Sequence, residues 1–156
     1  MAVLTSLFLD TTVLLGGLIE FSPQSPEQSI FDAIAAGRIR KPQTAWHCCL
    51  EFFAVATRLP PEYRLAPADA VDLLKGEVFG RLAVHQLASP ALENFLNEAA
   101  NDRVIGGRVY DAHIARIARQ SGADAVVTGN RRHFTSLLAH GIRVLTAEEL
   151  VKELDL

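Results

Sequence analysis

Short apolar runs alternate with longer helical patterns along this 156-residue chain, and this alternation constrains the fold more than any other feature. Five runs have the length and composition of strands: 5–9, 39–44, 81–86, 124–128 and 142–145. Helical patterns separate these runs, which favours parallel strands joined by helical crossovers. We therefore expect an α/β fold of three layers, α/β/α, with a central parallel sheet of about four or five strands.

The helical patterns begin and end at recognisable residues. Ser25 with Gln28, and Thr146 with Glu149, have the spacing of a capping box, in which each side chain bonds the backbone of the other. Gly122 ends the helix predicted for residues 107–120. The remaining helices are expected over residues 26–36, 45–58, 67–79 and 89–100.

The composition limits the classes of protein to consider. Hydrophobic residues make up 49% and charged residues 21% of the chain, as in a globular domain, and the net charge of −3 creates no general attraction for nucleic acid. Cys48 and Cys49 are neighbours, so we expect free thiols in a reducing compartment. No signal sequence is evident, and no apolar run approaches the roughly 20 residues that span a bilayer. We expect a cytoplasmic protein with no membrane contact.

Asp111 interrupts the apolar face of its helix. It precedes Ala115 and Ala118 by four and seven residues, so it lies on their side of the helix, which is expected to face the core. A carboxylate there is costly unless something positive meets it, and no Lys or Arg on the same face does. Asp10 directly follows an apolar strand, and residues 10–12 are expected to form a polar turn there. Glu51 lies on the apolar face of another helix.

Ligands of parallel sheets gather where the strands end, and Asp10 and Asn130 both follow strand ends. If Asp10, Glu51 and Asp111 meet at that edge, their repulsion must be relieved by raised pKa values or by a divalent cation. Oxygen ligands without His or Cys suit Mg²⁺ or Mn²⁺, which support phosphodiester hydrolysis. Asp124 begins its strand, roughly 13 Å from this edge, and reads as a turn residue.

Several segments resemble the PIN domain family. Residues 9–14, Leu-Asp-Thr-Thr-Val-Leu, are similar to its first motif, and residues 110–115 followed by 122–130 and 133–134 are similar to its helix, strand and polar loop. Glu51 fits the family's internal acid. The resemblance extends over nearly the whole chain, so we expect residues 1–156 to form one PIN-like domain.

The resemblance implies a metal-dependent ribonuclease, and most small single-domain bacterial PIN proteins look like VapC-type toxins of toxin–antitoxin pairs. Asp10, Glu51 and Asp111 would be the metal ligands. Asn130, a further candidate catalytic residue, occupies the place where many members have a fourth acid. An Asn carbonyl can bind a cation but carries no charge, so a second metal would be held weakly.

Other residues are candidates for the surroundings of the site. Thr11, Thr12 and Thr128 would hold the carboxylates, water or substrate, or else serve as ordinary turn and cap hydroxyls. Arg131 and Arg132 are candidates for substrate phosphates, or else belong to a solvated loop. The resemblance also implies an RNA substrate, a cognate antitoxin and a homodimer.

Two other functions are alternatives to the ribonuclease, and the sequence supports them unequally. Because Asn130 replaces an acid, the chain could be a PIN-fold module that binds RNA or protein without cutting it. A nucleotide-binding protein is disfavoured, since no glycine-rich loop follows the first strand. Among the histidines, His47 could reach the edge of the site, His113 is expected to pack elsewhere, and His133 shows no partner.

Overall fold

The computed structural model describes residues 4–156. Its five strands are β1 (Ser6–Leu9), β2 (Lys41–Ala45), β3 (Ala83–His85), β4 (Ala125–Val127) and β5 (Arg143–Leu145). Its α-helices are α1 (Thr11–Leu18), α2 (Pro26–Ala35), α3 (Trp46–Ala56), α4 (Pro67–Leu73), α5 (Ser89–Asn101), α6 (Arg108–Gln120) and α7 (Ala147–Leu154). A π-helix, η1 (Leu74–Phe79), continues α4, and a 3₁₀-helix, η2 (Arg131–His140), follows β4.

The strands form one parallel sheet in the order β3-β2-β1-β4-β5. β1, which is buried along its whole length, lies in the middle, with Phe8 aligned to Gln43 of β2 and to Val126 of β4. This confirms the expected parallel α/β sheet. The carboxyl ends of β1 and β4 therefore lie side by side.

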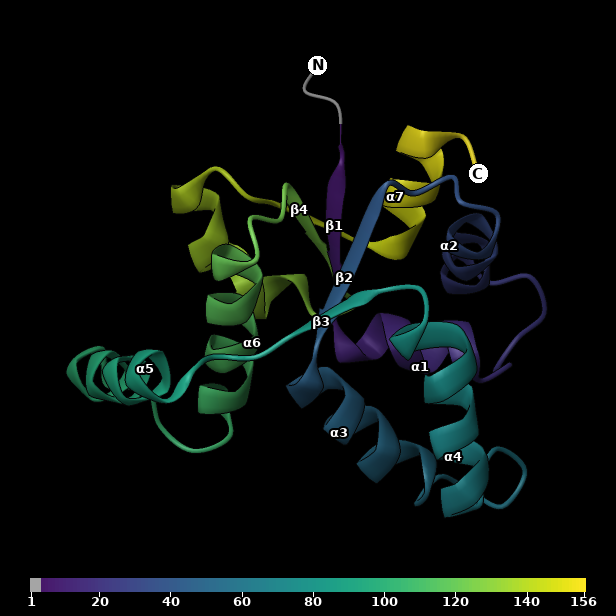
Figure 1. The fold of residues 1–156 in the computed structure, drawn as a ribbon, viewed down its shortest axis with the longest axis horizontal. Helices are drawn as coiled ribbons and strands as arrows, with labels where there is room; N and C mark the ends of the chain where they lie inside the picture. The colour runs from purple at the N-terminus through teal and green to yellow at the C-terminus, as the bar shows by residue number, and fades with distance from the viewer. Residues whose placement is uncertain (1–3) are drawn as a thin grey trace.

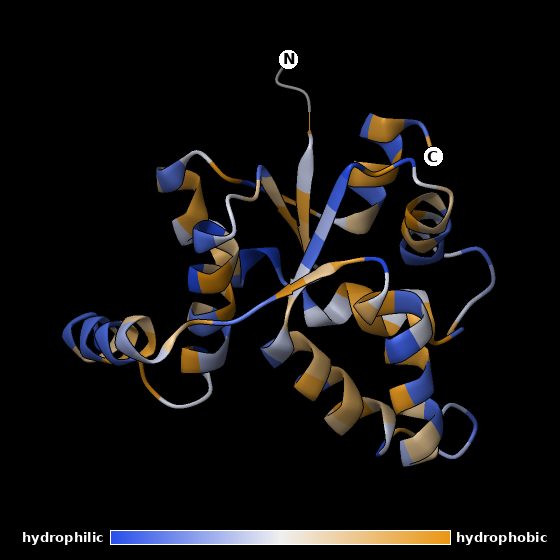
Figure 2. Ribbon diagram, viewed as in Figure 1, coloured by the Kyte–Doolittle hydropathy of each residue, from blue (hydrophilic) through white to orange (hydrophobic). Residues whose placement is uncertain are grey.

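Helices cover both faces of the sheet. Figure 1 shows α5 and α6 on one side of the strands and α1, α2 and α7 on the other. The largest fully buried side chains, Phe8, Phe52 and Phe134, come from β1, α3 and η2. The thiols of Cys48 and Cys49 are buried and free, and burial raises the pKa of Cys49 to about 11. Figure 2 shows a mostly hydrophobic α3 and a largely hydrophilic α5.

Local sequence signals explain several of the helix ends. Both predicted capping boxes form, Ser25 with Gln28 and Thr146 with Glu149. Gly122 takes a positive φ of 73° just beyond α6, where a side chain would be strained. Since these signals act over a few residues, the corresponding helices could be predicted.

Two segments differ from expectation. Asp10 is itself the N-cap of α1, so the helix begins directly after β1, without the expected polar turn. The segment expected to be a loop after β4 turns into the 3₁₀-helix η2 at Arg131. Both differences bring polar residues close to the strand ends.

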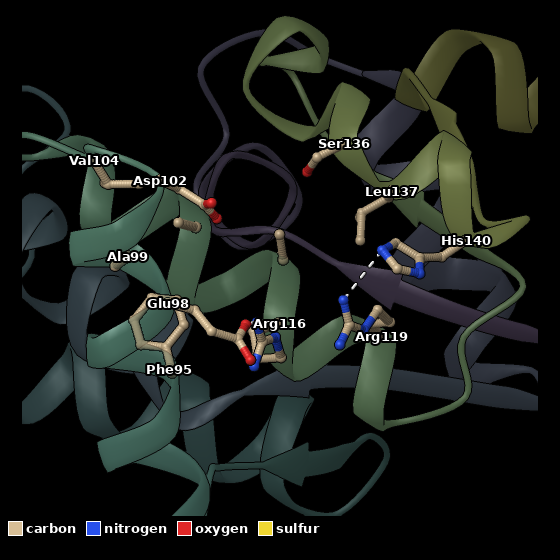
Figure 3. A pocket seen from close by; sticks show the side chains of 12 residues that line it. Phe95, Glu98, Ala99, Asp102, Val104, Arg116, Arg119, Ser136, Leu137 and His140 are labelled. Carbon is tan, nitrogen blue, oxygen red and sulfur yellow. Dashed lines mark hydrogen bonds and ion pairs between the residues drawn. The ribbon is translucent and has the colours of Figure 1, made fainter.

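A hollow of about 240 Å³ lies between α5, α6 and η2 (Figure 3). Both of its arginines are already engaged, since Arg116 pairs with Glu98 and Arg119 bonds His140. None of the helices within residues 4–156 is long and apolar enough to cross a membrane.

Candidate active site

Asp10 stands where β1 ends and α1 begins, and it is 3% exposed. As the N-cap of α1, its Oδ1 accepts a hydrogen bond of 2.7 Å from the backbone N–H of Thr11. Its own N–H donates to the carbonyl of Val127, the last residue of β4. The strand pairing and the helix cap together fix this carboxylate in the middle of the sheet edge.

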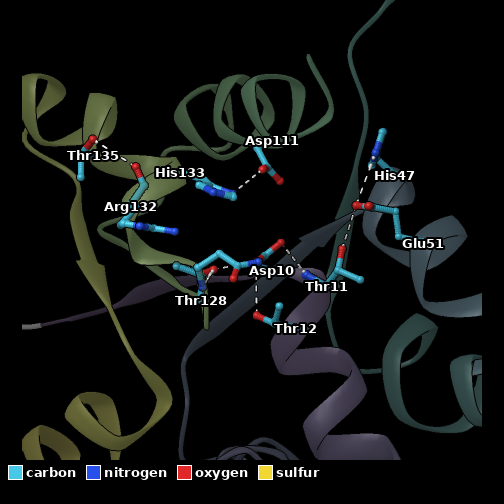
Figure 4. Close-up of polar contacts among 11 residues, drawn as sticks. Asp10, Thr11, Thr12, His47, Glu51, Asp111, Thr128, Arg132, His133 and Thr135 are labelled. Atoms are coloured by element: carbon cyan, nitrogen blue, oxygen red, sulfur yellow. Dashed lines mark hydrogen bonds and ion pairs between the residues drawn. The ribbon is translucent and has the colours of Figure 1, made fainter. Parts of the chain in front are cut away.

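Two threonine hydroxyls complete the surroundings of Asp10 (Figure 4). Oγ1 of Thr128 donates to Oδ2 of Asp10 over 2.6 Å, and Oγ1 of Thr12 reaches the same oxygen over 3.3 Å. These hydroxyls also accept backbone N–H groups, Thr12 from Gly129 and Thr128 from Asn130. The hydroxyls thus tie the loop after β4 to the start of α1.

Glu51 approaches Asp10 from α3. Its Oε1 accepts a 3.0 Å hydrogen bond from Oγ1 of Thr11 and lies 3.4 Å from Nε2 of His47, one turn earlier. The Glu51 side chain is 38% exposed, so this carboxylate lies at the rim of the site. His47 therefore does reach the edge of the site.

Asp111 approaches from the first turn of α6, and His133 meets it from η2. Nδ1 of His133 lies 2.7 Å from Oδ2 of Asp111, whose side chain is 31% exposed. The expectation that His133 has no partner is therefore wrong. The two residues are 22 positions apart, and only the path of η2 brings them together, so no local pattern could reveal the contact.

The three carboxylates are close enough to act on one another electrostatically. Burial raises the pKa of Asp10, and the charges of Asp111 and Glu51 add to the rise, while hydrogen bonds from Thr128 and Thr11 oppose it. Burial also raises the pKa of Glu51, again with a contribution from Asp111. The predicted convergence of acids from three distant segments is thus seen in the fold.

Two histidine side chains in mutual contact lie behind the rim. Nδ1 of His47 and Nδ1 of His113 are 3.0 Å apart, and burial lowers the pKa of both histidines. Because one of these nitrogens must donate and the other accept, the two rings cannot both be cationic in this contact. As expected, His113 is directed away from Asp111 and packs near Phe95.

The residues after β4 divide into two groups. Asn130 is exposed, and its backbone N–H donates to Thr128. Arg131 turns to Glu149 on α7, with which it forms an ion pair. Arg132 instead extends toward the carboxylates in Figure 4. The two neighbouring arginines have the same predicted role in the sequence analysis, but in the structure they face different surroundings.

The donor set is compatible with a hard divalent cation. Carboxylate oxygens of Asp10, Glu51 and Asp111 face a common edge, and no Lys or Arg forms an ion pair with any of them in the described part of the chain. Within residues 4–156, no three His, Cys, Asp or Glu side chains stand close enough to enclose a metal. An open arrangement suits Mg²⁺, which keeps several waters and takes one or two protein carboxylates.

The fold and site define a class: a parallel α/β sheet with a cluster of carboxylates at the carboxyl end of its central strand. The family model described as "PIN domain" matches residues 6–132, which include Asp10, Glu51, Asp111 and Asn130. The chain belongs to the PIN domain family, as the resemblance of its motifs predicted.

Comparison with known proteins agrees with this assignment. The chain is 34% identical over 101 residues to Ribonuclease VapC27 of Mycobacterium tuberculosis, covering 65% of this chain and 71% of that protein. PAE2754 of Pyrobaculum aerophilum is similar in fold, with a TM-score of 0.61 and 21% identity over 97% of each chain. VapBC2 of Rickettsia felis, bound to a DNA fragment from its promoter, matches with a TM-score of 0.60 and 13% identity, over 90% of this chain and 97% of that one.

Proposed function

We propose that this protein is a divalent-cation-dependent endoribonuclease. One observation carries the proposal: Asp10, Glu51 and Asp111 converge at the sheet edge, and the pKa of the buried Asp10 rises because it is desolvated beside two other acids. A cation relieves that repulsion, so the site is better suited to Mg²⁺ or Mn²⁺ than to three free carboxylates. The name of the M. tuberculosis relative, a ribonuclease, supports this activity.

Each carboxylate has a distinct part in this proposal. Asp10 is the fixed ligand, since backbone and hydroxyl groups orient both of its oxygens. Glu51 and Asp111 are rim ligands, each aligned by a histidine. A cation held by them supplies activation of water and neutralisation of the scissile phosphate.

Residues around the carboxylates hold the site in shape. The hydroxyls of Thr11, Thr12 and Thr128 donate to the carboxylates, which lets them orient these ligands as well as approach substrate. Asn130 stands beside Thr128, where its amide can contact RNA or a water bound to the cation. Such hydrogen-bonding partners commonly affect metal affinity by about ten- to a hundredfold.

We also propose a place in a toxin–antitoxin pair. The relative carries the VapC name, and the R. felis structure of similar fold is described as VapBC2 bound to promoter DNA. Exposed large apolar side chains on α3 and η1, Trp46 with Phe79 at a ring separation of 5.1 Å, offer a surface for an antitoxin or for a second copy in a homodimer.

A PIN-fold module that binds RNA or protein without cutting it is the second candidate. It is favoured by Asn130, which carries no charge where an acid would strengthen metal binding. Both candidates are compatible with RNA binding, but only the first predicts cleavage that requires the cation.

Calorimetric titration with Mn²⁺ and incubation with a labelled single-stranded RNA separate the two candidates. The nuclease binds Mn²⁺ and produces fragments that disappear with EDTA, and Asp111→Asn abolishes cleavage while leaving the fold intact. RNA binding without Mn²⁺ uptake or fragments establishes the binding module instead. Full activity in Asp111→Asn overturns the role of that carboxylate.

A further inference from the structure

A second hollow, of about 350 Å³, opens directly beside Asp111. It lies between the loop from α5 to α6, the first turn of α6, and η2. Asp111 and His133 form one of its sides, so it is continuous with the candidate active site. If the scissile bond of a polymeric substrate lies at the carboxylates, the neighbouring monomer would pass through this hollow.

Three arginines line this hollow, namely Arg103, Arg108 and Arg132. All three residues are exposed, and none forms an ion pair within the described residues 4–156. Two carboxylates, Asp102 and Asp111, also line it, and Asp111 is already bonded to His133. Positive charge therefore exceeds negative charge around this hollow, although the whole chain has a net charge of −3.

The adjoining hollow in Figure 3 provides the contrast. It shares Asp102 and Ser136 with this one, but Glu98 holds its Arg116 and His140 bonds its Arg119. Of these two adjoining hollows, only the one that opens on the acids is lined by arginines without a side-chain partner.

Arg103 is held in an unusual backbone conformation. Its φ is +57°, in the left-handed region, just after α5 ends at its C-cap, Asp102. Glycine is the usual residue at this position, because a side chain there is strained. Strained residues are concentrated at functional sites, where the surrounding structure over-determines them. An arginine here places positive charge at the rim of the hollow at some cost to the backbone.

Other groups around the hollow also suit an anion. Arg108 begins α6 and lines the hollow, so the positive N-terminal end of the helix dipole lies beside it. No side chain caps this helix end. The hydroxyl residues Thr135 and Ser136 line the opposite side, on η2. Arginine and hydroxyl side chains together are typical ligands of nucleic-acid phosphates.

We propose that this hollow binds a backbone phosphate of RNA adjacent to the scissile one, through Arg103, Arg108 and Arg132. The proposal rests on the nuclease function and adds the path of the strand, which leaves the acids across the start of α6. RNA is favoured over an acidic protein segment because the hollow adjoins the carboxylates. The carboxylates repel the phosphates of an RNA strand held there, and the arginines offset this repulsion.

Binding is measured in an Asp10→Asn background, so that the RNA stays intact, by anisotropy of a labelled single-stranded RNA at several salt concentrations. Arg132→Gln and Arg108→Gln should each weaken binding about tenfold and reduce the slope of log Kd against log salt by about 0.7. The matched control is Arg81→Gln, which removes the same charge from an exposed pair with Glu77. Equal affinities for all three variants overturn the proposal.

Arg103→Gly separates charge from folding. Glycine suits the positive φ, so this variant should unfold at the same or a higher temperature and still bind RNA more weakly. Weaker binding that accompanies a lower unfolding temperature contradicts the role of Arg103. Loss of binding to a glutamate-rich peptide, with RNA binding unchanged, overturns the proposal in favour of an acidic protein partner.

Cleavage by the same arginine variants, with Asp10 intact, distinguishes failure of the nuclease function from failure of the phosphate site. Reduced RNA binding with no cleavage by the unaltered protein in Mg²⁺ or Mn²⁺ means that the hollow binds RNA but the nuclease function fails. In the opposite outcome, the unaltered protein cleaves RNA in a cation-dependent way, but the arginine variants bind RNA as well as Arg81→Gln does. The nuclease function is then correct and the phosphate site is wrong.

Discussion

Two aspartates stand at opposite ends of the same strand pair, and their environments differ sharply. Asp10 follows β1 at the carboxyl edge, whereas Asp124 precedes β4 at the other edge. Each carboxylate accepts three hydrogen bonds, those of Asp124 coming from Thr5 and Ser6. Yet the pKa of Asp10 is raised by burial, and the pKa of Asp124 is lowered by its hydrogen bonds.

The number of hydrogen bonds therefore does not decide the state of a carboxylate in this fold. Asp10 is desolvated and faces Glu51 and Asp111, whereas Asp124 is partly exposed and feels the positive charge of Lys41. The Asp124 carboxylate joins β1 to β4 and stabilises the sheet. The Asp10 carboxylate is held in a strained electrostatic state that a cation would relieve.

The sharpest test of this comparison is to remove the two charges separately. Asp10→Asn should reduce RNA cleavage at least about a hundredfold, because it removes the fixed cation ligand. Asp124→Asn should leave the cleavage rate within about twofold of the unaltered protein, since it lies at the other end of the strands. Initial rates with a fluorescent RNA measure both. A folded Asp124→Asn chain without activity contradicts the division of roles.

Removing one hydroxyl from each aspartate tests the comparison at finer scale. Thr128→Val deletes the 2.6 Å bond to Asp10 and should weaken Mn²⁺ binding about ten- to a hundredfold. Thr5→Val deletes the 2.7 Å bond to Asp124 and should leave Mn²⁺ affinity unchanged. Calorimetric titration gives both dissociation constants. Equal losses in the two variants would show that the effect is structural.

The free energy of unfolding should fall more for the Asp124 variant than for the Asp10 variant, which is the opposite of the order expected for cleavage. Asp124→Asn should lower the free energy of unfolding by about 1 kcal/mol, since the lost hydrogen bonds are partly exposed to solvent, and the unfolding temperature by about 2–4 °C. Asp10→Asn removes a buried charge beside two like charges and should leave the unfolding temperature of the metal-free protein unchanged or higher. Thermal unfolding in EDTA, followed by circular dichroism, measures both. A larger fall for Asp10→Asn contradicts this order.

The pH dependence of stability provides the smallest effect, with opposite signs for the two aspartates. Because the folded pKa of Asp10 is raised above 3.8, folding binds a proton there, and stability falls as pH rises from about 4 through the raised pKa. The folded pKa of Asp124 is lowered, so its contribution is present above 3.8 and is lost as pH falls through the lowered value.

Urea midpoints of the metal-free protein between pH 3 and 7 measure these contributions as differences from each variant. Relative to Asp10→Asn, the unaltered protein should lose stability as pH rises. Relative to Asp124→Asn, its advantage should shrink below about pH 4. A constant difference across this range in either comparison contradicts the corresponding pKa shift.

Local patterns made much of the fold predictable. The capping boxes at Ser25 and Thr146 and the apolar runs of the strands depend on neighbours only a few positions away. The acids at 10, 51 and 111 could be singled out because each interrupts an apolar pattern without a nearby cation. The raised pKa of Asp10 agrees with the expectation that these acids meet and repel one another.

Contacts that depend on the path of a turn were not predictable. His133 meets Asp111 only because η2 folds back toward α6, and Arg131 faces Glu149 while Arg132 does not. The positive φ of Arg103 gives no sequence signal, since the usual marker of that conformation is glycine. These are the features that shape the surroundings of the acids.

The position of β4 in the sheet has a consequence for synthesis of the chain. β1 is made first, but its partner β4 ends at Val127, and Thr128 beyond it supplies the hydroxyl that holds Asp10. A growing polypeptide on the ribosome therefore lacks the assembled acidic edge until translation has passed Thr128. An enzyme that cuts RNA would in this way stay inactive until that part of its own chain had been made.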